Sequence, residues 1–132
     1  MFLSRDSFHE NGTLPTSGEI FVFGSNLAGR HGKGAALIAA KRFGAAYGVG
    51  SGITGQCYAI PTKDEDLRSL SLEAIAKSVE VFCEYTYTHK DKRFFVSAVG
   101  CGLAGYKPSD IAPMFSGCNV NCTFPHTWYG YV

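Results

Sequence analysis

Residues 20–23 (IFVF) are all apolar, and this run constrains the fold more than any other stretch of the sequence. A strand with one solvated face alternates apolar and polar side chains, whereas an unbroken apolar run is typical of a strand buried on both faces. Strands of that kind occur in sheets that carry helices on both sides. The run therefore predicts a central sheet between two layers of helices.

Two longer segments have the composition or spacing of helices. Residues 34–43 are rich in alanine, and residues 70–89 place apolar side chains at helical intervals. Ser69 or Ser71 can cap the second helix, because a serine oxygen accepts a hydrogen bond from the first helical turn. We expect a short third helix later in the chain, with Asp110 as its N-cap.

Further strands are predicted at three apolar stretches, residues 57–60, 93–99 and 119–124. Pro61 is expected to stop the first of them. Residues 1–18 and 44–55 are dense in turn-forming residues and are expected to be loops. Strands and helices then alternate, which predicts a three-layer α/β fold with a mostly parallel or mixed sheet. We expect one domain over residues 1–132, with 1–18 as its lead-in.

Charge and hydropathy exclude several classes of protein. The net charge is +1 and the basic residues form no block, so binding of duplex nucleic acid through its phosphates is not indicated. No apolar run approaches the roughly 18 residues of a membrane span, and the opening MFLSRDSFHE has no secretory signal pattern. These features predict a cytoplasmic protein without a membrane partner.

The cysteines form no CxxC pair, which predicts reduced thiols in a cytosolic protein. They are Cys57, Cys83, Cys101, Cys118 and Cys122. A zinc site at Cys118, Cys122 and His126 is the alternative. Steps of four residues suit ligands on a helix, but residues 119–124 alternate like a strand and a fourth ligand is missing. We therefore predict no metal site and no cofactor.

Three distinctive segments directly follow predicted strands, namely residues 24–34, 61–63 and 100–106. Ligands of open α/β sheets bind at the carboxyl ends of the strands, where such loops lead into helices. Glycine-rich loops expose backbone N–H groups, and helix N-termini carry partial positive charge. Two glycine loops at one crevice therefore predict a site for a diphosphate.

Other interpretations of these loops compete with this one. The first loop has Arg30 and His31 where a nucleotide-triphosphate P-loop requires Lys and Ser or Thr. Residues 100–105 match GxGxxG, but no acidic residue follows at the distance of about 20 positions that a dinucleotide-binding fold requires. The glycines also suit plain tight turns, and this alternative stays open.

In these segments the sequence resembles the macro domain, a module that binds ADP-ribose. The resemblance spans residues 19–124. It lies in Asn26 followed by GKGAA (32–36), in AIPTK (59–63) and in VGCGLAG (99–105). The last two motifs are similar to the branch that removes ADP-ribose from DNA and from acidic side chains. Relatives this small are often encoded by bacteria and their phages, which would place the protein in a host cytoplasm.

The resemblance implies ligand contacts from the first and late loops. Asn26 would hydrogen-bond the distal ribose, since an amide both donates and accepts; an asparagine that merely favours a left-handed turn is the alternative. Leu103 and Tyr106 would line the ribose or adenine side, although Tyr106 suits a core position equally well. The implied ligand-binding set is Gly24, Ser25, Asn26, Gly32, Lys33, Gly34, Gly100, Cys101, Gly102, Leu103, Ala104, Gly105 and Tyr106.

Lys63, together with Asn26, forms the catalytic set that the resemblance implies. In the resembling branch a lysine at this place attacks the anomeric carbon of the terminal ribose, for which its amine must be neutral. Asp64, Glu65 and Asp66 would oppose neutrality if they faced the amine. A solvated lysine at the rim of the site is the alternative.

Two features of the family are missing from the sequence. A strand before the first loop usually brings an acidic residue to the adenine, where this chain offers only the remote Asp6. Some relatives have an aspartate at the place of Ala104, so that His31, His126 or the ligand's phosphate would have to accept the proton. The sequence therefore predicts binding of ADP-ribose, a related nucleotide or an ADP-ribosylated macromolecule. Hydrolysis through Lys63, a non-catalytic nucleotide binder and a small interaction module remain as alternatives.

Overall fold

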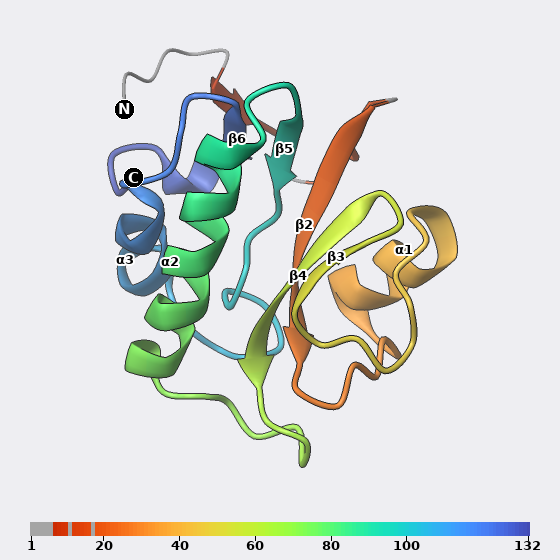
Figure 1. Ribbon diagram of the computed structural model, residues 1–132. Coiled ribbons are helices and arrows are strands. Elements are labelled where there is room, and N and C mark those ends of the chain that lie inside the picture. Colours follow the sequence, from red (N-terminus) through yellow and green to blue (C-terminus); the bar gives the residue numbers. More distant parts are fainter. Residues whose placement is uncertain (1–6, 11, 17) are drawn as a thin grey trace.

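The computed structural model describes residues 7–10, 12–16 and 18–132. Its strands form one six-stranded sheet in the order β1-β6-β5-β2-β4-β3 (Figure 1). The strands are β1 (Phe8–His9), β2 (Glu19–Asn26), β3 (Gly52–Thr54), β4 (Cys57–Lys63), β5 (Arg93–Val96) and β6 (Cys122–Pro125). The helices are α1 (Gly34–Arg42), α2 (Leu72–Thr88) and α3 (Pro108–Ile111), with the short 3-10 helices η2 (Ala112–Phe115) and η3 (His126–Trp128).

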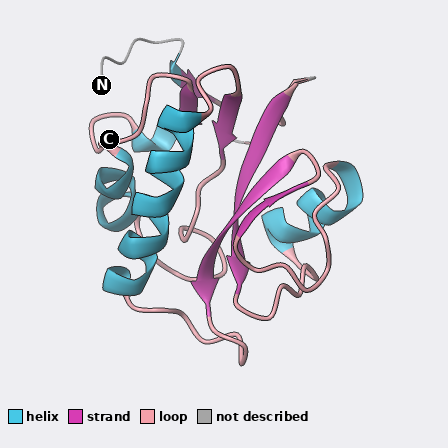
Figure 2. Cartoon of the chain, in the orientation of Figure 1, coloured by secondary structure: helices cyan, strands magenta, loops and turns pink. Residues whose placement is uncertain are grey.

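Neighbouring strands pair in parallel, except that β3 runs antiparallel to β4. The carboxyl ends of β2, β4 and β5 therefore lie along one edge of the sheet. Helix α1 covers one face, and α2 and α3 cover the other (Figure 2). The predicted α/β fold with a mixed sheet is confirmed.

The apolar run in β2 divides the core between the two faces of the sheet. Ile20 and Val22 pack in the cluster that includes α2, whereas Phe21 and Phe23 pack in the cluster that includes α1. All four side chains are at most 4% exposed, so the run is buried on both faces as predicted. Full burial of such side chains stabilises the fold by about 1.5–3 kcal/mol each.

Helix α2 forms where its periodicity predicts. Ser71 is the N-cap, and its Oγ accepts a hydrogen bond from the Ala74 N–H at 3.1 Å. The predicted apolar stripe faces the sheet, with Ile75, Val79 and Phe82 fully buried. This face attaches the helix to the sheet, while the serine cap fixes where the helix begins.

Several predictions about shorter elements are wrong. Residues 1–18 contain β1 and residues 44–55 contain β3, two strands too short to show a periodic pattern. Strand β4 continues through Pro61 to its end at Lys63. Strand β3 pairs with β4 only up to Ala59. At Pro61 that side of β4 has no partner strand, so the N–H that proline lacks is not needed for a hydrogen bond there.

The ends of other elements also differ from the prediction. Strand β5 stops at Val96, because the chain beyond it turns into the late glycine loop. The N-cap of α3 is Lys107 and not Asp110. Asp110 occupies the third helical position, where its carboxylate accepts a hydrogen bond from the Lys107 N–H at 3.0 Å. Both residues still belong to one capping arrangement.

A disulfide joins Cys83 on α2 to Cys118, so the prediction of five reduced thiols is wrong for this pair. The two residues are 35 positions apart and meet where α2 packs against the segment after η2, a proximity that spacing does not reveal. Cys57, Cys101 and Cys122 are free thiols. The described residues include no group of three or more that could hold a metal ion. None of the described helices is long and apolar enough to cross a membrane.

Candidate functional site

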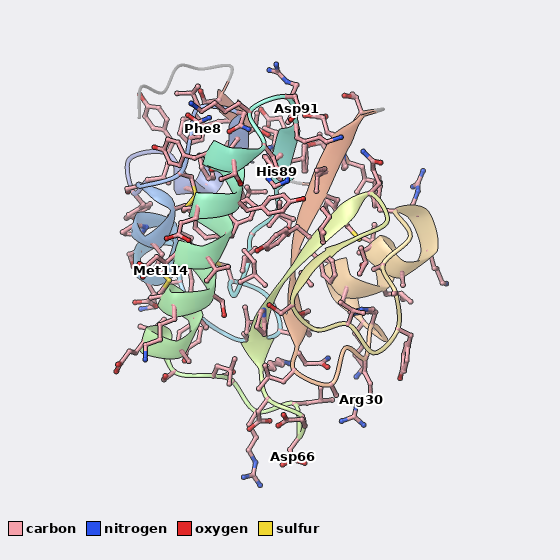
Figure 3. All side chains as sticks on the ribbon, viewed as in Figure 1. Phe8, Arg30, Asp66, His89, Asp91 and Met114 are labelled. Carbon is pink, nitrogen blue, oxygen red and sulfur yellow. A yellow bond between two sulfur atoms is a disulfide. The ribbon has the colours of Figure 1, made fainter. Side chains whose placement is uncertain are left out.

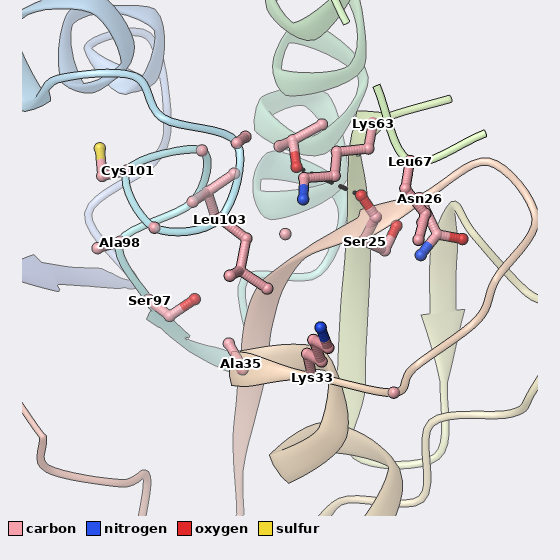
Figure 4. A pocket seen from close by; sticks show the side chains of 18 of the residues that line it. Ser25, Asn26, Lys33, Ala35, Lys63, Leu67, Ser97, Ala98, Cys101 and Leu103 are labelled. Carbon is pink, nitrogen blue, oxygen red and sulfur yellow. Dashed lines mark hydrogen bonds between the residues drawn. The ribbon is translucent and has the colours of Figure 1, made fainter. Parts of the chain in front are cut away.

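A cavity of about 760 Å³ opens at the carboxyl edge of the sheet, where the loops after β2, β4 and β5 converge (Figure 4). These are the three segments in which the sequence predicts a ligand site. Of the residues in the predicted ligand-binding set, all except Gly105 and Tyr106 line this cavity, and Lys63 lines it as well. The structure therefore brings together segments that are far apart in the chain.

The charged side chains among the described lining residues are all basic: Arg30, Lys33 and Lys63. In Figure 4 the amines of Lys33 and Lys63 extend into the cavity from the first loop and from the end of β4. Charges of one sign in a concave site attract ligands of the opposite sign. The cavity therefore favours an anionic ligand.

Helix α1 begins in the wall of the same cavity, at Gly34 and Ala35. Its N-cap residue, Lys33, makes no side-chain cap hydrogen bond, and the first turn contains no acidic residue. In α2, by contrast, Ser71 caps the start and Glu73 lies in the first turn. The free N–H groups and the positive end of the α1 dipole reinforce the attraction for an anion.

Four of the five glycines among the described lining residues fall into two groups; the fifth is Gly24. Gly34 and Gly100 are required by the backbone, because their φ angles are +59° and +75°; a Cβ added at Gly100 would also lie 3.0 Å from Ile111 Cδ1. Gly32 and Gly102 lie outside the left-handed region, and a Cβ added at either would meet no atom within 4 Å. The fold does not explain glycine at these two positions, whereas the close approach of a ligand to the backbone would.

Asn26 is buried at the end of β2, where it is 7% exposed. Its Nδ2 donates to the Arg30 carbonyl at 2.7 Å, and its Oδ1 accepts from the Arg30 N–H at 3.0 Å. These bonds shape the first loop. Asn26 is paired with Lys63 across the two strands and has no positive φ, so the left-handed-turn interpretation is wrong. One Nδ2 hydrogen and further Oδ1 capacity remain for a ligand.

Lys63 ends β4, and its amine forms no ion pair with any described residue. The adjacent Asp64 is engaged elsewhere, because its Oδ1 accepts hydrogen bonds from the N–H groups of Asp66 and Arg68, both at 2.9 Å. The acidic neighbours therefore make no salt bridge to the Lys63 amine.

The side chains of Tyr106 and Cys101 pack against the core of the protein. Tyr106 packs against the core, and its hydroxyl donates to the Leu70 carbonyl at 2.5 Å, which fits the core alternative. Burial raises the pKa of the Cys101 thiol, and in Figure 4 its sulfur is directed away from the centre of the cavity. The Cys101 thiol is thus directed out of the site, and its backbone N–H donates to the Ala98 carbonyl at 3.0 Å.

Neither histidine considered as a proton acceptor lines the cavity. His31 is buried, with Nε2 3.0 Å from the Ala46 carbonyl oxygen. His126 lies beyond β6, with its Nδ1 4.0 Å from Glu10. Each thus has a polar contact outside the cavity, while His31 Nδ1 is buried with no hydrogen-bond partner among the described residues. Asp6, considered for adenine recognition, lies outside the described residues.

The cavity also has lining residues outside the predicted ligand-binding set, among them Tyr47, Leu67 and Ser97. Arg30 and Thr62 are outside that set too, although they lie in segments that the sequence places at the site. Arg30 lies within the first glycine loop, and this position is the feature of the sequence that indicates a place at the site. Thr62 is adjacent to Lys63, and its Oγ1 donates to the Ser25 carbonyl at 3.3 Å. Tyr47 and Leu67 come from loops whose path no local pattern predicts.

No protein-family model matches the sequence, and no curated protein matches it. Solved structures with a similar fold include a protein of unknown function from Bacteroides thetaiotaomicron, with a TM-score of 0.58 and 16% identity over 84% of this chain and 88% of that one. They also include DarTG from Thermosipho africanus in complex with ADP-ribose, with a TM-score of 0.56 and 18% identity. That match covers 83% of this chain but 37% of DarTG. The fold of this chain is therefore similar to that of a part of DarTG.

Proposed function

We propose that the protein binds ADP-ribose in the cavity at the carboxyl edge of its sheet. The observation that carries this proposal is that all charged side chains among the described lining residues are basic and that α1 begins, without a side-chain cap, in the wall of the same cavity. Gly32 and Gly102 leave two stretches of backbone open on the loops that face this space. The diphosphate would lie between these loops, where N–H groups and cations neutralise it. The similarity to a part of DarTG, which was solved with ADP-ribose, supports the same ligand.

The terminal ribose would lie beside Asn26 and Lys63. The Asn26 amide is held in place by Arg30 and keeps hydrogen-bonding capacity for ribose hydroxyls. The described residues that line the cavity include no carboxylate to accept a hydrogen bond from the adenine amino group. The affinity would therefore come mainly from the diphosphate and the sugar.

Calorimetric titration with ADP-ribose tests this proposal, with AMP and ribose 5-phosphate as fragments. We expect ADP-ribose to bind with micromolar affinity. Each fragment should bind at least about a hundredfold more weakly, since neither can contact both loops at once. Equal affinity for AMP and ADP-ribose would contradict the proposed place of the diphosphate. No heat with any ligand would contradict the proposed function itself.

Hydrolysis of an ADP-ribosyl bond is the second candidate function, because the Lys63 amine enters the cavity without an ion-pair partner among the described residues. The neutral amine would form a bond to the anomeric carbon while the bond to the leaving group breaks, and water would then hydrolyse the adduct. With Ala104 in the late loop and both histidines outside the cavity, the ligand's phosphate is the available proton acceptor. The substrates would be ADP-ribosylated macromolecules.

The substitution Lys63→Ala separates hydrolysis from binding alone. If Lys63 is the nucleophile, the variant loses turnover of an ADP-ribosylated oligonucleotide or peptide by about 10³-fold or more and keeps ADP-ribose affinity within a few fold. Lys63→Arg is the matched control, because it keeps the charge but not the nucleophilic amine. Turnover by Lys63→Ala at the parent rate would contradict the covalent mechanism, and the absence of turnover in the parent protein would favour the non-catalytic binder.

A further inference from the structure

The turn after Lys63 contains an unusual backbone conformation at Leu67. Its φ is +63°, and no other non-glycine residue in the described parts of the chain has a positive φ. This left-handed conformation is unfavourable for a residue with a bulky side chain. A tight turn that needs it normally has glycine or asparagine at that place. The turn itself therefore does not explain the leucine.

Hydrogen bonds within the turn impose this conformation on residue 67. Asp64 Oδ1 accepts from the N–H groups of Asp66 and Arg68, and the Asp64 N–H donates to the Arg68 carbonyl at 2.8 Å. The Leu67 N–H donates to the Asp64 carbonyl at 3.1 Å. Because the backbone is held on both sides of residue 67, the direction of its Cα–Cβ bond is fixed.

Three hydrogen bonds tie residues 64–70 to the first and late loops, one of them the bond from the Tyr106 hydroxyl to the Leu70 carbonyl described above. The Arg30 guanidinium donates to the Glu65 carbonyl, and Ser69 Oγ donates to the Ala104 carbonyl at 2.7 Å. Figure 3 shows Arg30 and Asp66 at the same end of the molecule. The turn is thus attached to both the first loop and the late loop, and Leu67 is held in position relative to each of them.

The Leu67 side chain is 52% exposed, so it contributes little to the core. It lines the cavity, and Figure 4 shows it beside Asn26 and Lys63. An apolar side chain in an unfavourable backbone conformation, directed at a ligand cavity, is a typical feature of a functional contact.

We propose that Leu67 is a specificity-determining residue that packs against the C–H face of the terminal ribose of ADP-ribose. This inference rests on the proposed function, in which Asn26 and Lys63 lie beside that ribose. The amide and the amine contact the polar side of the sugar, and Leu67 covers its apolar side. Leu67 therefore selects nucleotides that carry a second sugar, so that ADP-ribose binds more tightly than ADP.

The test compares calorimetric affinities of the parent and of Leu67→Asn for ADP-ribose and for ADP. Asparagine tolerates the left-handed conformation but removes the apolar surface. We expect ADP-ribose affinity to fall about tenfold, since a partly buried leucine contact is lost, while ADP affinity stays within twofold. The thermal midpoint of the variant should equal or exceed that of the parent, which shows that the fold is intact.

Two further variants complete the comparison. Leu67→Met keeps an apolar side chain and should bind ADP-ribose within about threefold of the parent. Val81→Ala is the matched control, because Val81 is an exposed apolar residue on α2 that does not line the cavity; it should change neither affinity. Parent-like ADP-ribose binding by Leu67→Asn, or an equal loss for ADP and ADP-ribose, would overturn the role of Leu67 and leave the proposed function intact. If the parent binds neither nucleotide, the proposed function fails, and this inference fails with it.

Discussion

At the scale of single residues, substitutions at Gly32 and Gly102 test whether the first and late loops form a ligand site or are only tight turns. Neither has a positive φ, and a Cβ at either position would enter open space. Alanine should therefore leave the free energy of unfolding unchanged or raise it by up to about 1 kcal/mol, because the unfolded chain loses freedom.

Binding should respond in the opposite direction. In the proposed site the added methyl group occupies the approach of a phosphate oxygen to the backbone, so we expect Gly102→Ala and Gly32→Ala to weaken ADP-ribose binding by about tenfold or more. Gly117→Ala is the matched control, because Gly117 has the same open surroundings but does not line the cavity. Calorimetry and thermal unfolding of all three variants check the prediction. Unchanged ADP-ribose affinity in both loop variants would favour the interpretation of these loops as turns.

At the scale of elements, His9 attaches the outermost strand β1 to the strands β6 and β5. Its ring stacks on Phe95 with centroids 3.7 Å apart, and its Nδ1 lies 3.2 Å from Thr123 Oγ1. Burial is the main cause that lowers the pKa of His9 to about 4, with a smaller lowering from His126; Glu19 and the Val96 backbone act in the opposite direction. The folded protein therefore holds His9 neutral where the unfolded chain would protonate it.

This difference predicts a pH dependence of stability. Below a pH of about 6.5 the unfolded state binds more protons at His9 than the folded state, so the free energy of unfolding falls as the pH is lowered towards about 4. In His9→Phe the stack on Phe95 can remain while the titration is removed. Urea denaturation at several pH values should therefore show a shallower loss of stability for this variant than for the parent. Parallel pH profiles would contradict the buried neutral histidine.

The elements that the sequence predicts correctly are those with a pattern long enough to be specific. The apolar run of β2 and the stripe of α2 require burial wherever they lie, so their place in the fold follows from local information. The two-residue β1 and the three-residue β3 depend on a partner strand already being present. The prediction that Pro61 stops the strand is wrong for a related reason, because the effect of a proline depends on whether another strand pairs with that side of β4.

The same distinction applies to the candidate site. The glycines of the first and late loops directly follow strands, so the sequence predicts that they lie at the cavity, which they line. Tyr47 and Leu67 lie in loops, and they reach the cavity because side-chain hydrogen bonds fix the path of those loops. Beside Tyr47 these are the bonds of Ala46, whose N–H donates to Thr54 Oγ1 and whose carbonyl lies 3.0 Å from His31 Nε2. Around Leu67 they are the bonds to Asp64 Oδ1, and residue spacing alone does not reveal either set.

At the scale of the whole molecule, the Cys83–Cys118 bond links α2 to the segment that precedes β6. Closing a loop with a separation of 35 residues stabilises a folded protein by about 3–4 kcal/mol, chiefly by restricting the unfolded chain. We expect Cys83→Ala/Cys118→Ala to lower the thermal midpoint by roughly 10 °C. ADP-ribose affinity measured well below that midpoint should not change, because neither cysteine lines the cavity.

A reducing agent provides the matching comparison for the disulfide. Dithiothreitol should lower the midpoint of the parent towards that of the double variant and leave the double variant unaffected. If the parent and the double variant unfold at the same temperature under oxidising conditions, the two thiols are not bonded in solution. The original expectation of reduced cysteines would then hold for the whole chain.

A crystal structure of the protein with ADP-ribose would show whether the first and late loops together hold one diphosphate. We expect the diphosphate between residues 32–34 and 100–102, with backbone N–H groups donating to it and the terminal ribose beside Asn26 and Lys63. A cavity without the nucleotide at saturating ADP-ribose, or ADP-ribose bound elsewhere on the molecule, would contradict it.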